Sequence, residues 1–151
     1  MTNQELMTVY SGIQKFQEME KKSFEETGKK ILSGKIQLAY AINKNKEGIR
    51  QALQPYVETR NAIIEEYRDT KAEQAAWEAE KDAAEAEERQ MNPVKVSIRP
   101  GKSLEEYQEK LLELERMETD FEPKKVPLPQ FEGLELTSEE LDPFIFMISE
   151  E

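Results

Sequence analysis

The feature that most constrains the fold is a heptad-spaced row of side chains between residues 36 and 88. Counting every seventh residue gives one mainly apolar line: Ile42, Ile49, Tyr56, Ile63, Thr70 and Trp77. A neighbouring line carries Leu53 and Tyr67 among polar exceptions. Lines interleaved at spacings of three and four residues are typical of a helix that buries one stripe and exposes the rest. The pattern therefore predicts a long helix that packs against another helix, and it indicates an interaction surface and no reaction.

The charge content of the chain favours an elongated helical protein. Of the 151 residues 35% are charged and 37% are hydrophobic, and the mean hydropathy is −0.81. This balance is rich in charge for an ordinary globular domain. No apolar run approaches the roughly 18 residues of a membrane span, and the first residues lack the basic and then apolar order of a signal peptide. We expect a soluble protein of the cytoplasm of whatever cell makes it, one that does not enter membranes.

The absence of cysteine and histidine removes most catalytic and metal-binding arrangements. Disulfides, thiol nucleophiles, thiolate or imidazole metal ligands and imidazole acid–base chemistry all need one of these residues. Adjacent carboxylates such as Glu65 and Glu66 point to different faces of a helix, whereas an acid–base pair needs burial. We therefore expect no enzyme activity, no cofactor and no metal site.

The net charge of −11 comes from the second half of the chain. Residues 71–151 contain 10 Lys and Arg against 22 Asp and Glu, a net charge of −12. Because a negative body repels phosphates, direct binding of nucleic acid is not expected. The main basic concentration is read as a solvated face, with a weak patch for nucleic acid or an acidic partner as the alternative. It comprises Lys29, Lys30, Lys35, Lys44, Lys46 and Arg50.

The N-terminal residues predict the partner helix that the heptad row requires. Apolar side chains recur at helical spacing from Asn3 to about Thr27, and Gly28 has the place of a left-handed cap at the helix end. A short connection then makes the two helices antiparallel neighbours. Pro55 lies inside the long segment, where it either kinks the helix or restarts it.

The stretch 70–90 is rich in Ala and Glu and predicts a helical extension. Its one large apolar side chain is Trp77. This tryptophan either packs against the end of the helical hairpin or anchors a partner protein, since aromatic anchors dominate interface energies. The rest of the stretch is expected to be solvated.

Residues 91–151 predict a smaller unit that mixes helices with short strands. Val94, Val96 and Ile98 alternate with polar residues, as in a half-buried strand. A second edge strand at 124–128 is expected to pair with them, either parallel or antiparallel. Ser103 with Glu106 forms a capping box before a helix at 104–119.

A second capping box, Thr137 with Glu140, precedes a terminal helix from Ser138 to about Ser149. This helix is so apolar that it must pack on this chain or on another. The predicted fold is mainly α, with a long antiparallel helical hairpin (1–90) and a small α+β C-terminal unit with a two-stranded ribbon (91–151). We expect the two parts to pack as one domain.

Two stretches of the sequence also carry a resemblance. These are GKIQLAYAINKNKEGIRQALQPYVETRNAIIEEY (34–67) and VPLPQFEGLELTSEELDPFIFMISEE (126–151). They are similar to small proteins encoded by tailed bacteriophages and prophages of Gram-positive bacteria, a group described as a domain of unknown function. The resemblance implies a phage origin and a non-enzymatic accessory role, and it implies no catalytic residues.

The resulting hypothesis is a protein that acts through protein–protein interaction, in phage assembly or in modulation of a host factor. The partner is a phage protein, a host protein or a second copy of the chain. The candidate partner-binding residues are Tyr56, Tyr67, Trp77, Phe144 and Phe146. Two alternatives stay open: an acidic inhibitor that imitates nucleic acid, and a helical homo-oligomer held by the heptad lines.

Overall fold

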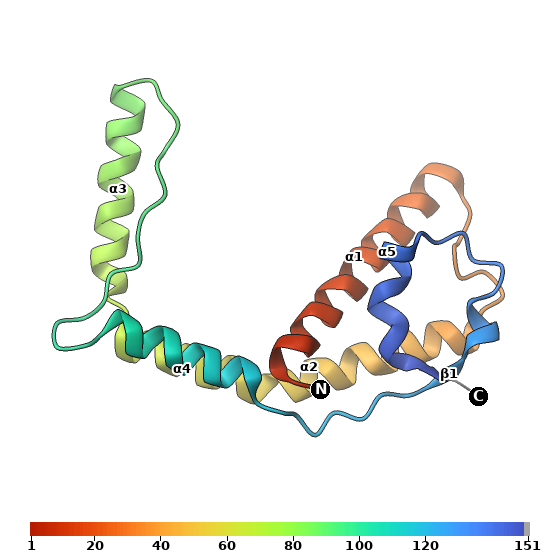
Figure 1. The fold of residues 1–151 in the computed structure, drawn as a ribbon. Helices are drawn as coiled ribbons and strands as arrows, with labels where there is room; N and C mark the ends of the chain where they lie inside the picture. Colours follow the sequence, from red (N-terminus) through yellow and green to blue (C-terminus); the bar gives the residue numbers. More distant parts are fainter. Residues whose placement is uncertain (150–151) are drawn as a thin grey trace. The chain divides into compact units, whose positions relative to one another are not determined.

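The computed structural model describes residues 1–149 and is mainly helical, as predicted (Figure 1). Its elements in chain order are α1 (Asn3–Thr27), α2 (Ile36–Tyr67), α3 (Thr70–Ala86), α4 (Leu104–Arg116), β1 (Val126–Pro127), η1 (Leu128–Phe131), α5 (Ser138–Leu141), η2 (Asp142–Met147) and β2 (Ile148–Ser149), where η denotes a 3-10 helix. None of these described helices is long and apolar enough to cross a bilayer.

The chain forms two compact units whose limits differ from the predicted 1–90 and 91–151 segments. The first unit combines Met1–Tyr56 with the residues from Glu115 onward, and the second is Val57–Leu114. Helix α2 begins in the first unit and ends in the second, and the chain returns through α4. Hydrophobic periodicity cannot show such a division, because the apolar rhythm of α2 continues through both units.

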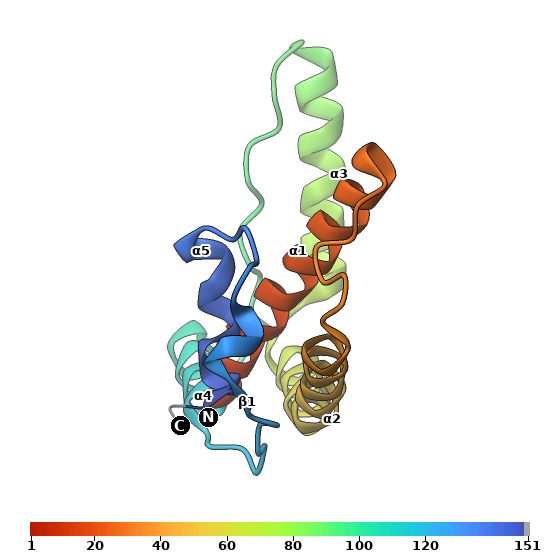
Figure 2. The same cartoon turned by 90° about the vertical axis from the view of Figure 1, so that its right-hand side faces the viewer.

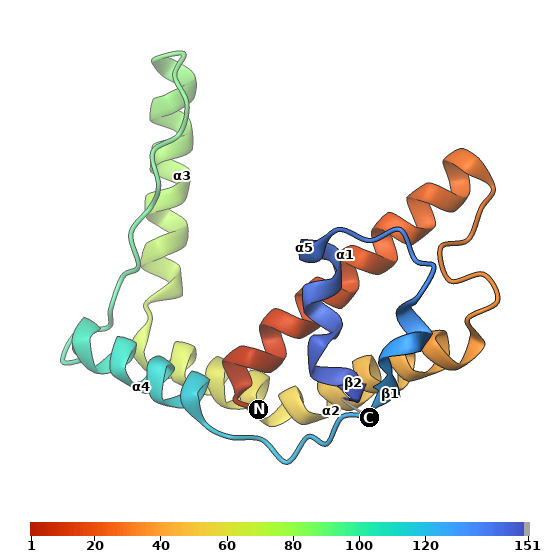
Figure 3. The same ribbon diagram turned by 45° about the vertical axis from the view of Figure 1, so that its right-hand side comes forward.

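In the first unit, α1 and the start of α2 form the predicted antiparallel hairpin, which Figure 3 shows as an open pair. Thr2 caps α1 and forms a capping box with Glu5, and Gly28 ends the helix with φ 71°. The side chain of Gln17 contacts α2 twice, donating to Asn43 over 3.0 Å and accepting from Lys46 over 2.6 Å.

The C-terminal segment (residues 115–149) completes the core of the first unit. Figure 2 shows its α5 and η2 beside α1. Phe144 is fully buried, with its ring edge-on to Phe16 at 4.9 Å between centroids and tilted against Phe131 at 6.1 Å. The other core side chains of this unit are Leu6, Ile13, Leu38, Ala41, Ile42, Ile49, Leu53, Tyr56, Val126 and Met147. The apolar stripe of α2 in this unit is therefore buried within the chain.

The side chain of Asn45 holds the C-terminal segment on α2 through two hydrogen bonds to the backbone of Lys124. This side chain, 1% exposed, donates to the carbonyl of Lys124 over 2.9 Å and accepts from the amide of Lys124 over 2.7 Å. At its start, the segment bonds to the N-terminal residues in an antiparallel bridge between Thr2 and Glu118. These polar contacts fix where the segment crosses the two helices.

In the second unit, α3 is joined to an extended return segment (residues 90–99) that runs beside it in Figures 1 and 3. Glu73 forms a forked ion pair with Arg68 and accepts from the amide of Ser97 over 3.2 Å. About two helical turns further along the same face of α3, the carboxylate of Glu80 pairs with Arg89 and accepts a hydrogen bond from the amide of Asn92. These carboxylates stabilise the return segment by accepting its backbone donors.

Two sequence predictions about strands need correction. The return segment contains Val94–Ile98, but within residues 1–149 these residues form no strand, and only Ile98 makes an isolated bridge with Arg68. The two-stranded ribbon instead joins β1 to β2 in parallel, with Val126 opposite Ile148. Residues 94–98 instead run beside helix α3 (Figures 1 and 3).

Two helix predictions also need correction. The 36–88 helix continues through Pro55 but breaks after Tyr67, because Asp69 caps α3 by accepting from the amide of Ala72. The terminal helix is α-helical only over Ser138–Leu141 and then tightens into the 3-10 helix η2. Pro143 lacks the amide hydrogen that an α-helix would need there.

Candidate functional site

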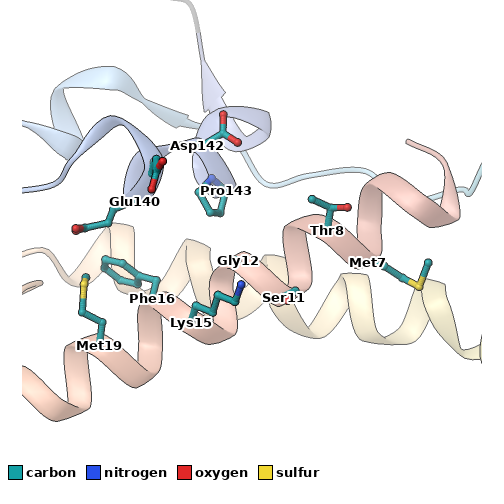
Figure 4. A pocket seen from close by; sticks show the side chains of 11 residues that line it. Met7, Thr8, Ser11, Gly12, Lys15, Phe16, Met19, Glu140, Asp142 and Pro143 are labelled. Atoms are coloured by element: carbon teal, nitrogen blue, oxygen red, sulfur yellow. The ribbon is translucent and has the colours of Figure 1, made fainter. Parts of the chain in front are cut away.

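In the first unit, a groove runs along α1 beneath α5 and η2 (Figure 4). Its volume is about 670 Å³. Helix α1 and the C-terminal segment both line it, with Met7, Thr8, Ser11, Gly12, Lys15, Phe16 and Met19 from the former and Glu139, Glu140, Asp142 and Pro143 from the latter. It is the best-formed candidate for a binding site in this unit.

The position of the C-terminal segment over α1 depends on Gly12. The ring of Pro143 points at this glycine in Figure 4, and a Cβ at position 12 would lie 2.5 Å from the Cγ of Pro143. No real side chain fits that distance. Phe144 follows directly and reaches the core against Phe16. Because residue 12 has no side chain, η2 can pack directly against α1 at Pro143.

We expect Gly12→Ala to destabilise the protein although alanine favours helices. The gain in helix propensity is about 1 kcal/mol, whereas forcing a methyl group into a packed contact costs about 1–3 kcal/mol. The Cβ of Pro143 would also lie only 2.7 Å from the new methyl group, so the clash is removed by glycine at position 143, which leaves the Cα at 3.8 Å. Gly12→Ala should therefore become stabilising in a Pro143→Gly background. Thermal melting of the four proteins in this cycle measures the change of sign. An equal effect of Gly12→Ala in both backgrounds would contradict the contact.

The groove combines an apolar floor with a negative rim. Phe16, Met7 and Met19 line the hollow with apolar side chains; Phe16 is buried, and Met7 and Met19 are half-buried. The C-terminal side carries the carboxylates of Glu139, Glu140 and Asp142 against the single ammonium of Lys15 on α1. An apolar surface with this excess of negative charge is complementary to a cationic amphipathic partner.

A second hollow of about 330 Å³ lies where α1 meets α2 and their connection. Glu20 lines it, and partial burial raises the pKa of this carboxyl group, while a hydrogen bond from the backbone of Leu32 opposes that rise. Lys30 lies over the ring of Phe24 at 5.6 Å at its edge. The volume of this hollow is about half that of the groove, and Glu20 is the one carboxylate among the residues that line it. We therefore take the groove as the candidate site.

The five sequence-predicted binding residues lie in both units and differ in burial. Tyr56, Tyr67 and Phe144 are buried within the chain, at 5%, 3% and 0% exposure, so their side chains belong to the core in this fold. Phe146 is half-buried beside Phe121, with ring centroids 6.2 Å apart. The heptad spacing correctly indicated that Tyr56 and Tyr67 are buried. Spacing alone does not distinguish burial within the chain from burial against a partner.

Trp77 has an intermediate position in the second unit. It lies between Glu73 and Glu80 on one face of α3 and lines a small hollow with Val94 and Lys95 of the return segment. Its side chain is still 43% exposed. The contact in this structure is with the return segment, and a role of Trp77 as a partner anchor stays a prediction.

The groove residues were missed by sequence reasoning because no motif unites them. Met7 and Met19 lie 12 positions apart on α1, and the acidic wall is more than 100 residues further along the chain. The available signal was Gly12, a residue that weakens a helix and so points to a close contact. Among residues 1–149 there is also no group of three or more Asp or Glu side chains arranged to hold a metal ion.

Comparisons with protein-family models, with curated proteins and with solved structures found no match to this chain.

Proposed function

We propose that the protein is a non-enzymatic binding protein whose groove on α1 receives a cationic amphipathic helix of a partner protein. The observation that carries this proposal is the pairing of an apolar floor with the acidic rim of Glu139, Glu140 and Asp142. Helices that lie in grooves of this kind insert apolar side chains at spacings of three and four and keep their charges at the edge.

The dimensions and side chains of the groove suit a helix. Met7 and Met19 lie 12 positions apart on α1, so the groove follows this helix for about 18 Å or three turns. Methionine side chains at both ends are unbranched and adapt to the shape of an apolar partner. Phe16, held by Phe144, gives the centre of the floor a fixed ring. The carboxylates would attract Lys or Arg side chains on the rim of such a helix.

The proposed setting is that of a phage accessory protein, in assembly or in modulation of a host factor. The support for this setting is the resemblance of residues 34–67 and 126–151 to phage-encoded proteins. The support for binding over catalysis is the absence of cysteine and histidine from the sequence. A partner from the phage or its host follows from the same resemblance.

Imitation of nucleic acid is less well supported as a function. It needs a row of free carboxylates, and one strongly acidic stretch of the chain lies in and after α3. Two carboxylates of that helix, Glu73 and Glu80, are already paired with Arg68 and Arg89 and with backbone amides of the return segment. Their charges stabilise the unit itself and are not presented as a free row.

The test is the affinity for a synthetic helix of Leu and Lys, about four turns long, measured by fluorescence anisotropy. Replacing both Glu139 and Glu140 by Gln should weaken binding about tenfold at low salt, because it removes two rim charges. The matched control replaces Glu25 and Glu26 at the far end of α1 by Gln, with the same change in net charge and little effect. Equal weakening by both pairs would mean that the probe senses only net charge, and would contradict the groove.

A further inference from the structure

One face of the first unit collects lysines and lacks carboxylates. Residues 27–46 contain five lysines and no acidic residue, and residues 123–131 contain two lysines and again no acidic residue. The chain as a whole has a net charge of −11. Because salt screens charges that lie more than roughly 8–10 Å away, a partner at this face senses chiefly the local positive charge.

These two stretches lie side by side on α2 (Figure 3). At one end, Asn45 bonds to the backbone of Lys124. The ammonium group of Lys124 lies 4.9 Å from the centre of the Tyr40 ring, nearer the start of α2. At the other end, the side chain of Gln130 donates to Gln37 over 3.3 Å. The resulting surface, formed by residues 35–45 and 124–130, is called the basic strip below.

The lysines around the strip differ in what they contact. Lys46 turns toward α1, where it donates to Gln17 and lies over the ring of Tyr10 at 5.7 Å. Lys44 and Lys124 are exposed, and within residues 1–149 neither forms an ion pair with a carboxylate. The strip therefore has two ammonium groups that can pair with carboxylates of another molecule.

The strip also exposes large apolar side chains. Ile36 is 82% exposed, and Tyr40 and Leu128 are each 55% exposed. Ile36, Tyr40 and Lys44 follow one another at four-residue steps, so they lie on one face of α2. Leu128 lies in the second stretch, between its contacts with α2. The strip thus combines apolar surface with positive charge, whereas the groove combines apolar surface with negative charge.

We infer that the basic strip binds an acidic amphipathic segment of a partner protein. Carboxylates of such a segment would pair with Lys44 and Lys124, and its apolar side chains would cover Ile36, Tyr40 and Leu128. The charge of the strip selects an acidic partner. Its elongated shape, one helix and one neighbouring chain wide, matches a helical or extended protein segment.

Two other polyanions fit the strip less well. Single-stranded nucleic acid stacks its bases on successive aromatic rings. Within the strip Tyr40 is the one aromatic residue, and its ring already contacts Lys124. An anionic bilayer is flat and receives a broad apolar face, whereas the strip is narrow. The strip is a separate surface from the groove, so either proposal can fail while the other holds.

The first test is the affinity of the full chain for a synthetic helix of Leu and Glu, about four turns long, measured by fluorescence anisotropy. Replacing Lys44 and Lys124 by Gln should weaken binding about tenfold at low salt, because two charges are lost. The backbone bonds of Lys124 to Asn45 do not depend on its side chain. The matched control replaces the exposed Lys21 and Lys22 of α1 by Gln, with little effect. Equal weakening by both pairs would overturn the strip as the site.

The second test removes apolar contacts. Ile36→Ser and Leu128→Ser should each weaken binding of the Leu and Glu helix about fivefold, since each uncovers apolar area in the complex. Ile145→Ser, at an exposed position on η2, is the control and should have little effect. A helix of Ala and Glu should bind at least about tenfold more weakly than the Leu and Glu helix. Equal affinity for the two helices would mean that the strip senses only charge, and would overturn the proposal.

The third test offers a lipid surface to the same strip. Sedimentation with phosphatidylcholine vesicles that contain about 30% phosphatidylserine, an anionic lipid, should leave the protein in the supernatant. Sedimentation with these vesicles that is lost when Lys44 and Lys124 are replaced by Gln would overturn the assignment of the strip to a protein partner. Replacing Glu139 and Glu140 of the groove by Gln should not weaken binding of the Leu and Glu helix.

Discussion

Replacing Phe144 by alanine should destabilise the first unit more than any other single truncation. The ring is fully buried and packs against Phe16 and Phe131. Removing a buried phenylalanine ring costs about 3–5 kcal/mol, since the lost burial is joined by a cavity. The melting temperature should fall by on the order of 10 °C. Chemical denaturation followed by circular dichroism gives the change in the free energy of unfolding.

The matched control for this prediction is the next residue, Ile145. Its side chain is 57% exposed, so Ile145→Ala should change the free energy of unfolding by no more than about 0.5 kcal/mol. The contrast tests whether the C-terminal segment is part of the core. If Phe144→Ala melts like the native protein, this segment does not complete the hydrophobic core in solution.

Replacing Asn45 by leucine should cost about 2–4 kcal/mol, because both backbone groups of Lys124 lose their partner. Leucine has the same branched arrangement of side-chain heavy atoms as asparagine and a larger volume, so no cavity forms and the loss comes chiefly from the hydrogen bonds of 2.9 and 2.7 Å. The amides of residues 124–126 should also exchange faster with solvent, since the segment is no longer held on α2. Hydrogen exchange followed by mass spectrometry measures this local effect.

Asn43 supplies the comparison for Asn45. It lies on the same helix, is exposed, and bonds only to the side chain of Gln17. Asn43→Leu should cost less than about 1 kcal/mol and should leave exchange at residues 124–126 unchanged. Similar losses for the two variants would show that Asn45 contributes no more than a surface hydrogen bond.

Local signals predicted the hairpin well. The first helix has the predicted limits, and Gly28 ends it in the left-handed conformation that only glycine adopts easily. Ser103 and Thr137 accept hydrogen bonds from the amides of Glu106 and Glu140, which is the cap-residue half of each predicted capping box. These features depend on residues a few positions apart, so the sequence contains all the information they need.

Contacts between distant residues were not predictable in the same way. The strand at Val126 pairs with Ile148, and no periodicity distinguishes that partner from Val94–Ile98. The burial of Tyr56 and Tyr67 follows from packing partners that the heptad spacing does not identify. The groove depends on one contact between Gly12 and Pro143, 131 positions apart. Its acidic rim is recognisable only once that contact is known.

The most direct test of binding at the groove uses the six methionines of the chain as reporters. With their methyl carbons labelled, NMR spectra would be recorded while the Leu and Lys helix is added. The account predicts that the signals of Met7 and Met19 shift with the same saturation curve, and that those of Met91 and Met117 stay in place. Shifts confined to Met91 or Met117, or unchanged signals of Met7 and Met19 at saturation, would contradict the groove as the binding site.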